Sequence, residues 1–115
     1  MLIQITLNPG TWSASSSPDY FSFADLIATF ENTYENFATS AFPNNASTPT
    51  NKQAAFVHTG PTSAPITMVQ AITQTLGLKA SFYSDLPNTV AYNQFATSWP
   101  EYPGQLVLTQ ESLVL

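Results

Sequence analysis

The sequence of 115 residues contains no cysteine and no arginine, and its positively charged side chains are Lys52 and Lys79. Without cysteine there is no disulfide, no thiolate metal site and no cysteine nucleophile. Two lysines cannot neutralise the several phosphates that nucleic-acid binding usually involves, and they are weakly attracted to an anionic membrane. We therefore expect no nucleic-acid partner and no membrane partner.

Charge of either sign is scarce, because charged residues make up 8% of the chain and seven acids give a net charge of −5. Polarity comes instead from 42 Ser, Thr, Asn and Gln residues. The apolar runs are far shorter than the ~20 residues that cross a bilayer, and residues 1–7 lack the features of a signal peptide. The length predicts a single domain covering residues 1–115, and 13% aromatic residues are typical of a folded chain.

Alternation of apolar and polar residues predicts a half-buried strand over residues 2–7. Short apolar segments predict further strands at 54–58, 80–84 and 105–109, and residues 112–115 add a short edge. The first predicted strand, 2–7, and the last, 105–109, alternate apolar with polar residues. This pattern suggests that one face of the sheet is open to solvent or to a partner.

The clearest helix pattern spans residues 22–39, where apolar side chains recur at helical spacing and form one stripe: Phe23, Leu26, Ile27, Phe30, Tyr34 and Phe37. Glu31 and Glu35 lie off this stripe, and we interpret them as a solvated helix face rather than a cation site. A second helix is predicted over 65–76, with Gly77 as its stop signal. A third is predicted from Asn88, with four aromatic or apolar residues on one face: Ala91, Tyr92, Phe95 and Trp99.

The predicted order is β-α-β-α-β-α-β, and such alternation favours a sheet built from βαβ units. Because one sheet face is expected to be open, we predict an α+β fold: a two-layer sandwich of about four strands with two or three helices. The alternative is a small three-layer α/β fold.

His58 is the single histidine and ends a predicted strand, where open sheets place their ligands. The turn that follows leads into a helix N-terminus, which can hold an anion through backbone N–H groups and hydroxyls. The candidate ligand-binding residues are therefore His58, Thr59, Gly60, Thr62 and Ser63. The competing interpretation is an ordinary strand end and helix cap, because no acid near in sequence orients the ring. An enzyme using His58 as a base is a third possibility, but we predict that the protein is not an enzyme and uses no metal or cofactor.

Aromatic residues in segments rich in Pro, Ser and Gly are candidates for protein interfaces: Trp12, Tyr20, Trp99 and Tyr102. A small arginine-free domain rich in Thr, Asn, Ser and Pro is similar in composition to virion components. Our leading hypothesis is a non-enzymatic structural or decoration protein of a virus or phage particle (capsid, neck or tail), a homo-oligomer that contacts its own copies or other virion proteins. The alternative is a small viral inhibitor or nucleotide-sequestering protein in the host cytoplasm, with its pocket at the His58 turn.

Overall fold

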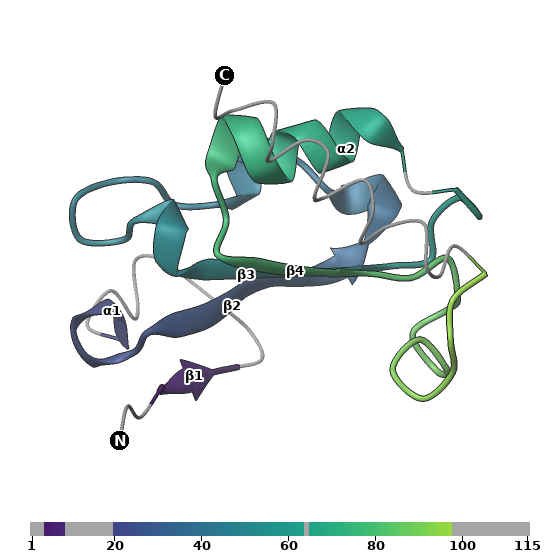
Figure 1. The fold of residues 1–115 in the computed structure, drawn as a ribbon, viewed down its shortest axis with the longest axis horizontal. Helices are drawn as coiled ribbons and strands as arrows, with labels where there is room; N and C mark the ends of the chain where they lie inside the picture. Colours follow the sequence, from purple (N-terminus) through teal and green to yellow (C-terminus); the bar gives the residue numbers. More distant parts are fainter. Residues whose placement is uncertain (1–3, 9–19, 64, 98–115) are drawn as a thin grey trace.

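Four strands form the centre of the computed structural model, which describes residues 4–8, 20–63 and 65–97. They are β1 (Thr6–Leu7), β2 (Leu26–Thr33), β3 (Gln53–His58) and β4 (Ala80–Tyr83). Every pairing is parallel, and the strands lie side by side in sequence order. The carboxyl ends of the strands therefore lie along one edge of the sheet, toward the right in Figure 1.

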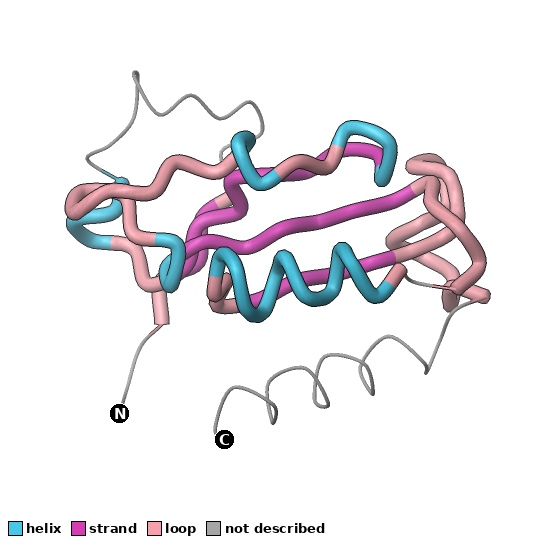
Figure 2. Tube along the Cα trace, turned by 90° about the horizontal axis from the view of Figure 1, so that it is seen from above, coloured by secondary structure: helices cyan, strands magenta, loops and turns pink. Residues whose placement is uncertain are grey.

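The segments between the strands contain short helices. α1 (Tyr20–Phe23) is a single turn before β2, and α2 (Ile66–Gln70) continues as π-helix over Ala71–Leu76 before β4. Between β2 and β3 the chain forms three 3-10 turns: Tyr34–Asn36, Thr39–Ala41 and Thr50–Lys52. Figure 2 shows α2 lying along the strands. Within the described residues, no helix has the length and apolar character needed to span a membrane.

The main core lies between α2 and one face of the sheet. It is built from buried side chains of β2, β3, β4, α2 and the two connections: Phe30, Phe42, Ala55, Val57, Met68, Val69, Ile72, Leu76, Leu78 and Tyr83. The Phe30 and Phe42 rings stack with centroids 5.6 Å apart, and Phe37 meets Phe30 edge-on at 5.7 Å. Because the connections before β3 and before β4 share this core, both lie on the same face of the sheet.

A buried polar network fixes the centre of β2 against β3. Thr29 is the extra residue of a β-bulge opposite Ala54–Ala55, and its hydroxyl donates to Gln53 Oε1 at 2.8 Å. Gln53 has no exposed surface, and its Nε2 donates to the carbonyl oxygens of Pro43 and Thr48 at 2.6 and 3.1 Å. The amide thus ties β2, β3 and the loop between them together.

The predicted helix over residues 22–39 is wrong, because its central part is strand β2. The run Leu26–Phe30 is largely buried, as in parallel sheets whose strands have both faces covered. Such a continuous apolar run cannot be told from a helix by periodicity alone. The residues on either side form α1 and the first 3-10 turn, so the apparent helical stripe joins three separate elements.

The predicted two-layer α+β sandwich is also wrong. The described residues form an all-parallel four-stranded sheet with few helices, and 3-10 turns take the place of a helix between β2 and β3. The connections before β3 and before β4 carry the chain back across one face of the sheet, so each of these strands enters in the same direction as the strand before it and pairs with it in parallel.

Local sequence signals predicted several other elements correctly. The strands predicted at 54–58 and 80–84 and the helix predicted at 65–76 are confirmed as β3, β4 and α2 with its extension. Gly77 ends that helix in the left-handed region, with φ of 64°. The helix predicted from Asn88 is wrong in its described part, which is a series of turns. The strand predicted at 105–109 and the edge at 112–115 lie outside the described residues.

Candidate functional site

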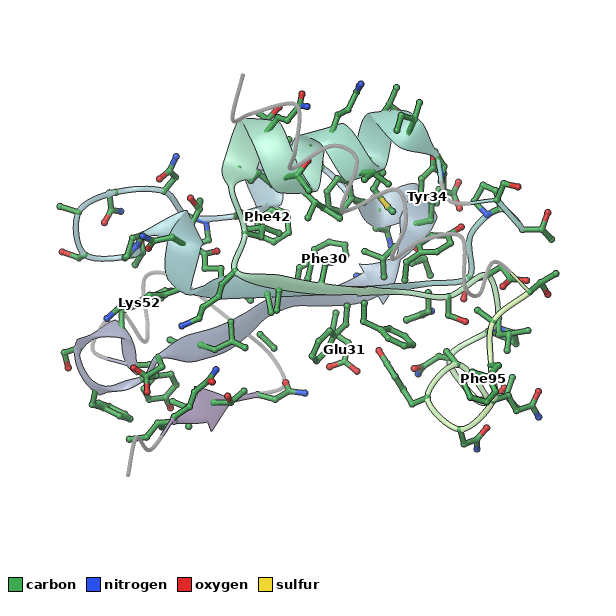
Figure 3. All side chains as sticks on the ribbon, viewed as in Figure 1. Phe30, Glu31, Tyr34, Phe42, Lys52 and Phe95 are labelled. Atoms are coloured by element: carbon green, nitrogen blue, oxygen red, sulfur yellow. The ribbon has the colours of Figure 1, made fainter. Side chains whose placement is uncertain are left out.

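Glu31 lies on the sheet face opposite α2. Side chains alternate across a sheet, so Phe30 and Ala55 face α2, whereas the next residues, Glu31 and Phe56, face away from it. Figure 3 shows Glu31 on the other side of the sheet from Phe30 and α2. Glu31 is in register with Phe56, and Phe56 is in register with Phe82, so the three side chains form a row across β2, β3 and β4.

Groups from opposite edges of the sheet meet at the Glu31 carboxylate. Asn8, the residue after β1, donates from Nδ2 to Glu31 Oε2 at 3.2 Å. Tyr92, in the loop that follows β4, has its hydroxyl near enough to this carboxylate for Glu31 to raise the pKa of that hydroxyl. The carboxylate thus lies beside groups more than 80 residues apart in the sequence.

Three aromatic rings lie on the same face of the sheet as this carboxylate. The centroids of Phe56 and Phe82 are 6.3 Å apart with the rings edge-on, and those of Phe82 and Tyr92 are 5.2 Å apart. Phe56 and Tyr92 complete the triangle at 6.4 Å. We call Asn8, Glu31, Phe56, Phe82 and Tyr92 the Glu31 cluster.

The Glu31 cluster raises the pKa of the Tyr92 hydroxyl. Partial burial of this side chain, which is 49% exposed, is the largest cause, and hydrogen bonding to Glu31 and the negative charge of that carboxylate add to it, so that the pKa rises from 10.0 to about 12. All three factors disfavour the phenolate. The cluster thus combines a hydrogen-bond acceptor, a neutral hydroxyl, an amide and aromatic rings, which suits an uncharged ligand that carries both hydroxyls and apolar C–H groups.

A pocket of about 380 Å³ adjoins the cluster. Phe82 and Tyr92 line it together with residues of the following loop, among them Asn93, Gln94 and Phe95. Its size lies toward the lower end of the range for small-molecule sites, which begins at about 300 Å³. Its lining again pairs aromatic rings with amides.

The loop that forms this pocket is held at both ends. Asp85 Oδ1 accepts a hydrogen bond from the Thr97 N–H at 2.7 Å, which joins residues 12 apart. Inside the loop, the Pro87 carbonyl accepts from the N–H groups of Val90 and Ala91 at 3.0 and 2.9 Å. Ala91 is 1% exposed and anchors the loop on the protein.

The structure brings part of the predicted His58 site together. His58 is buried, and its Nδ1 lies 2.7 Å from the Thr59 hydroxyl oxygen. Thr59 has φ of 55°, an unusual conformation for a β-branched residue, and its N–H donates to the Leu86 carbonyl at 2.9 Å. Thr62 and Ser63 are exposed beyond this turn. A ligand at these residues stays a prediction.

Gly60, the remaining residue of that prediction, is needed for close packing. A Cβ at this position would lie 2.9 Å from the Tyr34 Cβ and would meet the Tyr83 hydroxyl. That hydroxyl donates to the Pro61 carbonyl. The turn is therefore packed between two tyrosines.

The predicted interface residues lie mostly outside the described part of the chain, which does not include Trp12, Trp99 or Tyr102. Tyr20 is half-buried and packs against the small cluster of Phe21, Ala24 and Ile27. An interface role for these residues, and self-association, stay predictions.

Both lysines donate hydrogen bonds to backbone carbonyls away from the Glu31 cluster. Lys52 Nζ donates to the Phe21 carbonyl at 3.1 Å, and Lys79 Nζ donates to the Asp25 carbonyl at 3.4 Å, both beside α1. Among the residues that the structure describes, no group of three or more His, Asp or Glu side chains is placed to hold a metal ion.

A larger hollow of about 490 Å³ lies on the α2 side of the chain. Its lining includes Tyr34, Glu35 and Thr39 after β2, with Thr67 and Met68 from α2. The two glutamates that the sequence places four residues apart thus belong to different surfaces: Glu31 to the row across the sheet and Glu35 to this hollow.

Comparison with known proteins establishes the family. The model of spherulation-specific family 4 (Spherulin4) matches residues 2–106. The chain belongs to this family. No curated protein matches the chain.

A solved structure shows the same fold. The crystal structure of Aspergillus clavatus Sph3 in complex with GalNAc is similar to this family member with a TM-score of 0.71 and 23% sequence identity. The alignment covers 90% of this chain and 42% of the Sph3 chain, so the chain spans less than half the length of Sph3. At this identity the likeness establishes the fold and no more.

The virus hypotheses are wrong. The chain belongs to spherulation-specific family 4 and resembles a fungal protein, which overturns the predicted virion component, the predicted viral inhibitor and the predicted virion or host-cytoplasm location. The composition misled because a surface poor in charge and rich in hydroxyls and amides has no link to one class of protein. It indicates how a ligand is contacted, not which particle the protein belongs to.

Proposed function

We propose that this chain is a sugar-binding part of a glycoside-hydrolase-like protein, with the sugar bound at the Glu31 cluster. The observation that carries the proposal is the Glu31 carboxylate, which accepts a hydrogen bond from Asn8 and lies on the sheet face that carries the Phe56, Phe82 and Tyr92 rings.

The position of the cluster in the fold supports a binding site. Parallel strands in sequence order, with the connections before β3 and before β4 on one face, are an arrangement found in TIM-type barrels. In such folds ligands bind at the carboxyl ends of the strands. Glu31 lies near that end of β2, two residues before its last residue, Thr33.

The chemistry of the cluster supports a sugar as the ligand. Sugar hydroxyls donate to a carboxylate, and charge-assisted hydrogen bonds of this kind are about twice as strong as neutral ones. The apolar C–H face of a sugar ring packs on aromatic rings such as those of Phe56, Phe82 and Tyr92. The solved structure of Sph3, which shares the fold, contains GalNAc.

Catalysis by this segment alone is not part of the proposal. Most glycoside hydrolases use a pair of carboxyl groups beside the scissile bond. Among the residues that the structure describes, the Glu31 cluster contains one carboxyl group, that of Glu31. We propose that the chain binds the sugar without hydrolysing it, in keeping with the prediction that it is not an enzyme.

Titration of the full chain with GalNAc tests this function. Glu31→Gln keeps the shape of the side chain but removes its charge, so the affinity is expected to fall by about tenfold or more. Glu35→Gln makes the same change four residues away on another surface and is expected to leave the affinity unchanged. Equal loss in both variants, or no binding by the unmodified chain, would contradict the proposal.

A further inference from the structure

We propose that the hollow on the α2 side of the chain binds an alkylammonium group, carried by a small amine or by a lysine side chain of another protein. We call it the Glu35 hollow, and its lining includes Tyr34, Glu35, Phe37, Thr39, Thr67 and Met68. Its volume of about 490 Å³ lies within the range of small-molecule sites, about 300–1,000 Å³. The inference does not depend on sugar binding, because the Glu31 cluster lies on the opposite face of the sheet.

The Glu35 carboxylate gives this hollow a negative charge. Glu35 lies in the 3-10 turn that follows β2, and its side chain is exposed. Lys52 and Lys79 donate their hydrogen bonds elsewhere, to carbonyl oxygens beside α1. The net charge of −5 attracts cations from solution. A metal ion is disfavoured because it needs several ligands, and the described residues include no group of three or more such side chains. A single positive charge matches the single carboxylate.

The groups around Glu35 fit the head of an alkylammonium ion. Such a head has three N–H donors and no acceptor. The Glu35 carboxylate and the hydroxyl oxygens of Thr39 and Thr67 supply acceptors in the lining. Tyr34 contributes an aromatic ring, and cations pack on the faces of such rings. The described part of the lining contains no positive charge and no amide side chain, so it suits neither an anion nor the sugar proposed for the Glu31 cluster.

The apolar part of the lining fits an aliphatic stem. Met68 is 3% exposed, and Phe37 packs on Phe30 and Phe42 with ring centroids 5.7 and 5.8 Å apart. Figure 3 shows Tyr34 on the same side of the sheet as α2, where the main core lies. Because the core holds these side chains in place, a ligand that packs on them orders few further groups.

The test adds three ligands to the full chain and follows backbone amide chemical shifts: n-pentylammonium, Nα-acetyl-lysine N-methylamide, and 1-pentanol, in which a hydroxyl replaces the ammonium. Both amines are expected to bind more tightly than pentanol, with the largest shifts at the lining residues. Glu35→Gln is expected to weaken amine binding roughly two- to fivefold, as for the loss of an exposed ion pair.

A matched pair of variants tests where the charge must lie. Thr67→Glu adds a carboxylate to the lining and is expected to strengthen amine binding roughly two- to fivefold. Gln70→Glu adds the same charge at an exposed residue of α2 outside this lining and is expected to change amine binding less than Thr67→Glu does.

The outcomes separate this inference from the proposed function. Tighter binding of the blocked lysine supports it with a protein side chain as the ligand, and tighter binding of pentylammonium supports it with a small amine. Pentanol binding as tightly as the amines, unchanged amine affinity in Glu35→Gln, or equal effects of Thr67→Glu and Gln70→Glu would overturn it. If the amines displace GalNAc, they bind at the Glu31 cluster, and this inference fails while sugar binding stands. If GalNAc does not bind but the amines behave as expected, the proposed function fails and this inference stands.

Discussion

Replacing Gln53 with leucine is expected to be among the most destabilising single changes in this chain. The glutamine side chain has no exposed surface and makes three hydrogen bonds to different elements. It accepts from the Thr29 hydroxyl in β2 and donates to the carbonyls of Pro43 and Thr48 in the loop before β3. Leucine has a similar volume but cannot replace any of these bonds.

The magnitude follows from the partners that are left behind. A typical hydrogen bond contributes about 1 kcal/mol, and a buried partner left without one costs about 1–3 kcal/mol. Gln53→Leu leaves three partners without their hydrogen bond, and one of them, Thr29, is only 6% exposed. We therefore expect this substitution to lower the free energy of unfolding by about 3–5 kcal/mol. That is a large part of the roughly 5–15 kcal/mol by which a domain is stable.

Urea unfolding followed by circular dichroism measures this change. Gln70→Leu, at an exposed position of α2, makes the same substitution and is expected to stay within about 0.5 kcal/mol of the unmodified chain. Adding Thr29→Val to Gln53→Leu is expected to cost little more, because the hydroxyl has already lost its acceptor. A loss below about 1 kcal/mol for Gln53→Leu would refute the idea that this network ties β2, β3 and their loop together.

Two further predictions concern the carboxyl edge of the sheet. Gly60→Ala is expected to lower the free energy of unfolding by about 1–3 kcal/mol, because the new Cβ would press on Tyr34 and Tyr83; unchanged thermal unfolding would show that the turn can relax. Tyr92 is expected to titrate near pH 12. Because its pKa in the folded state is above the ordinary value of 10.0, its contribution to the free energy of unfolding is complete below pH 10 and is lost as the pH rises toward 12. Ultraviolet titration should lose this late transition in Tyr92→Phe and show it earlier in Glu31→Gln; a late transition that persists in Tyr92→Phe would contradict the assignment.

The elements that could be predicted from the sequence are those with local signals at both ends. β3 is a short apolar run that ends at His58 before a turn, and the helix containing α2 begins after Pro65 and ends at Gly77. Each boundary depends on the backbone preferences of one or two residues. Distant parts of the chain do not change these preferences.

β2 could not be assigned in this way, because its character depends on neighbours far away in sequence. Its buried run gains its hydrogen bonds from β1 and β3, neither of which is visible in a local window. Apolar residues in α1 and in the turn after β2 happened to extend the run with helical spacing. Periodicity therefore favoured one long helix over a strand with a turn on either side.

The same error concealed the site. The sequence pattern places Glu31 on a solvated helix face and Tyr92 on the face of another helix, whereas the structure has strand β2 at Glu31 and turns at Tyr92. One signal was available: Glu31 directly follows a buried run, so the strand-end rule that singled out His58 applies to it as well. The partnership of Glu31 with Asn8 and Tyr92 depends on the order of the strands, which the sequence alone did not reveal.

The most direct test of sugar binding at the Glu31 cluster is to map backbone amide chemical shifts while GalNAc is added to the full chain. The account predicts that the largest shifts occur at the cluster residues, which lie just after β1, on β2, β3 and β4, and in the loop after β4: Asn8, Glu31, Phe56, Phe82 and Tyr92. Shifts confined to α2 and the hollow that contains Glu35, or no shifts at all, would contradict it.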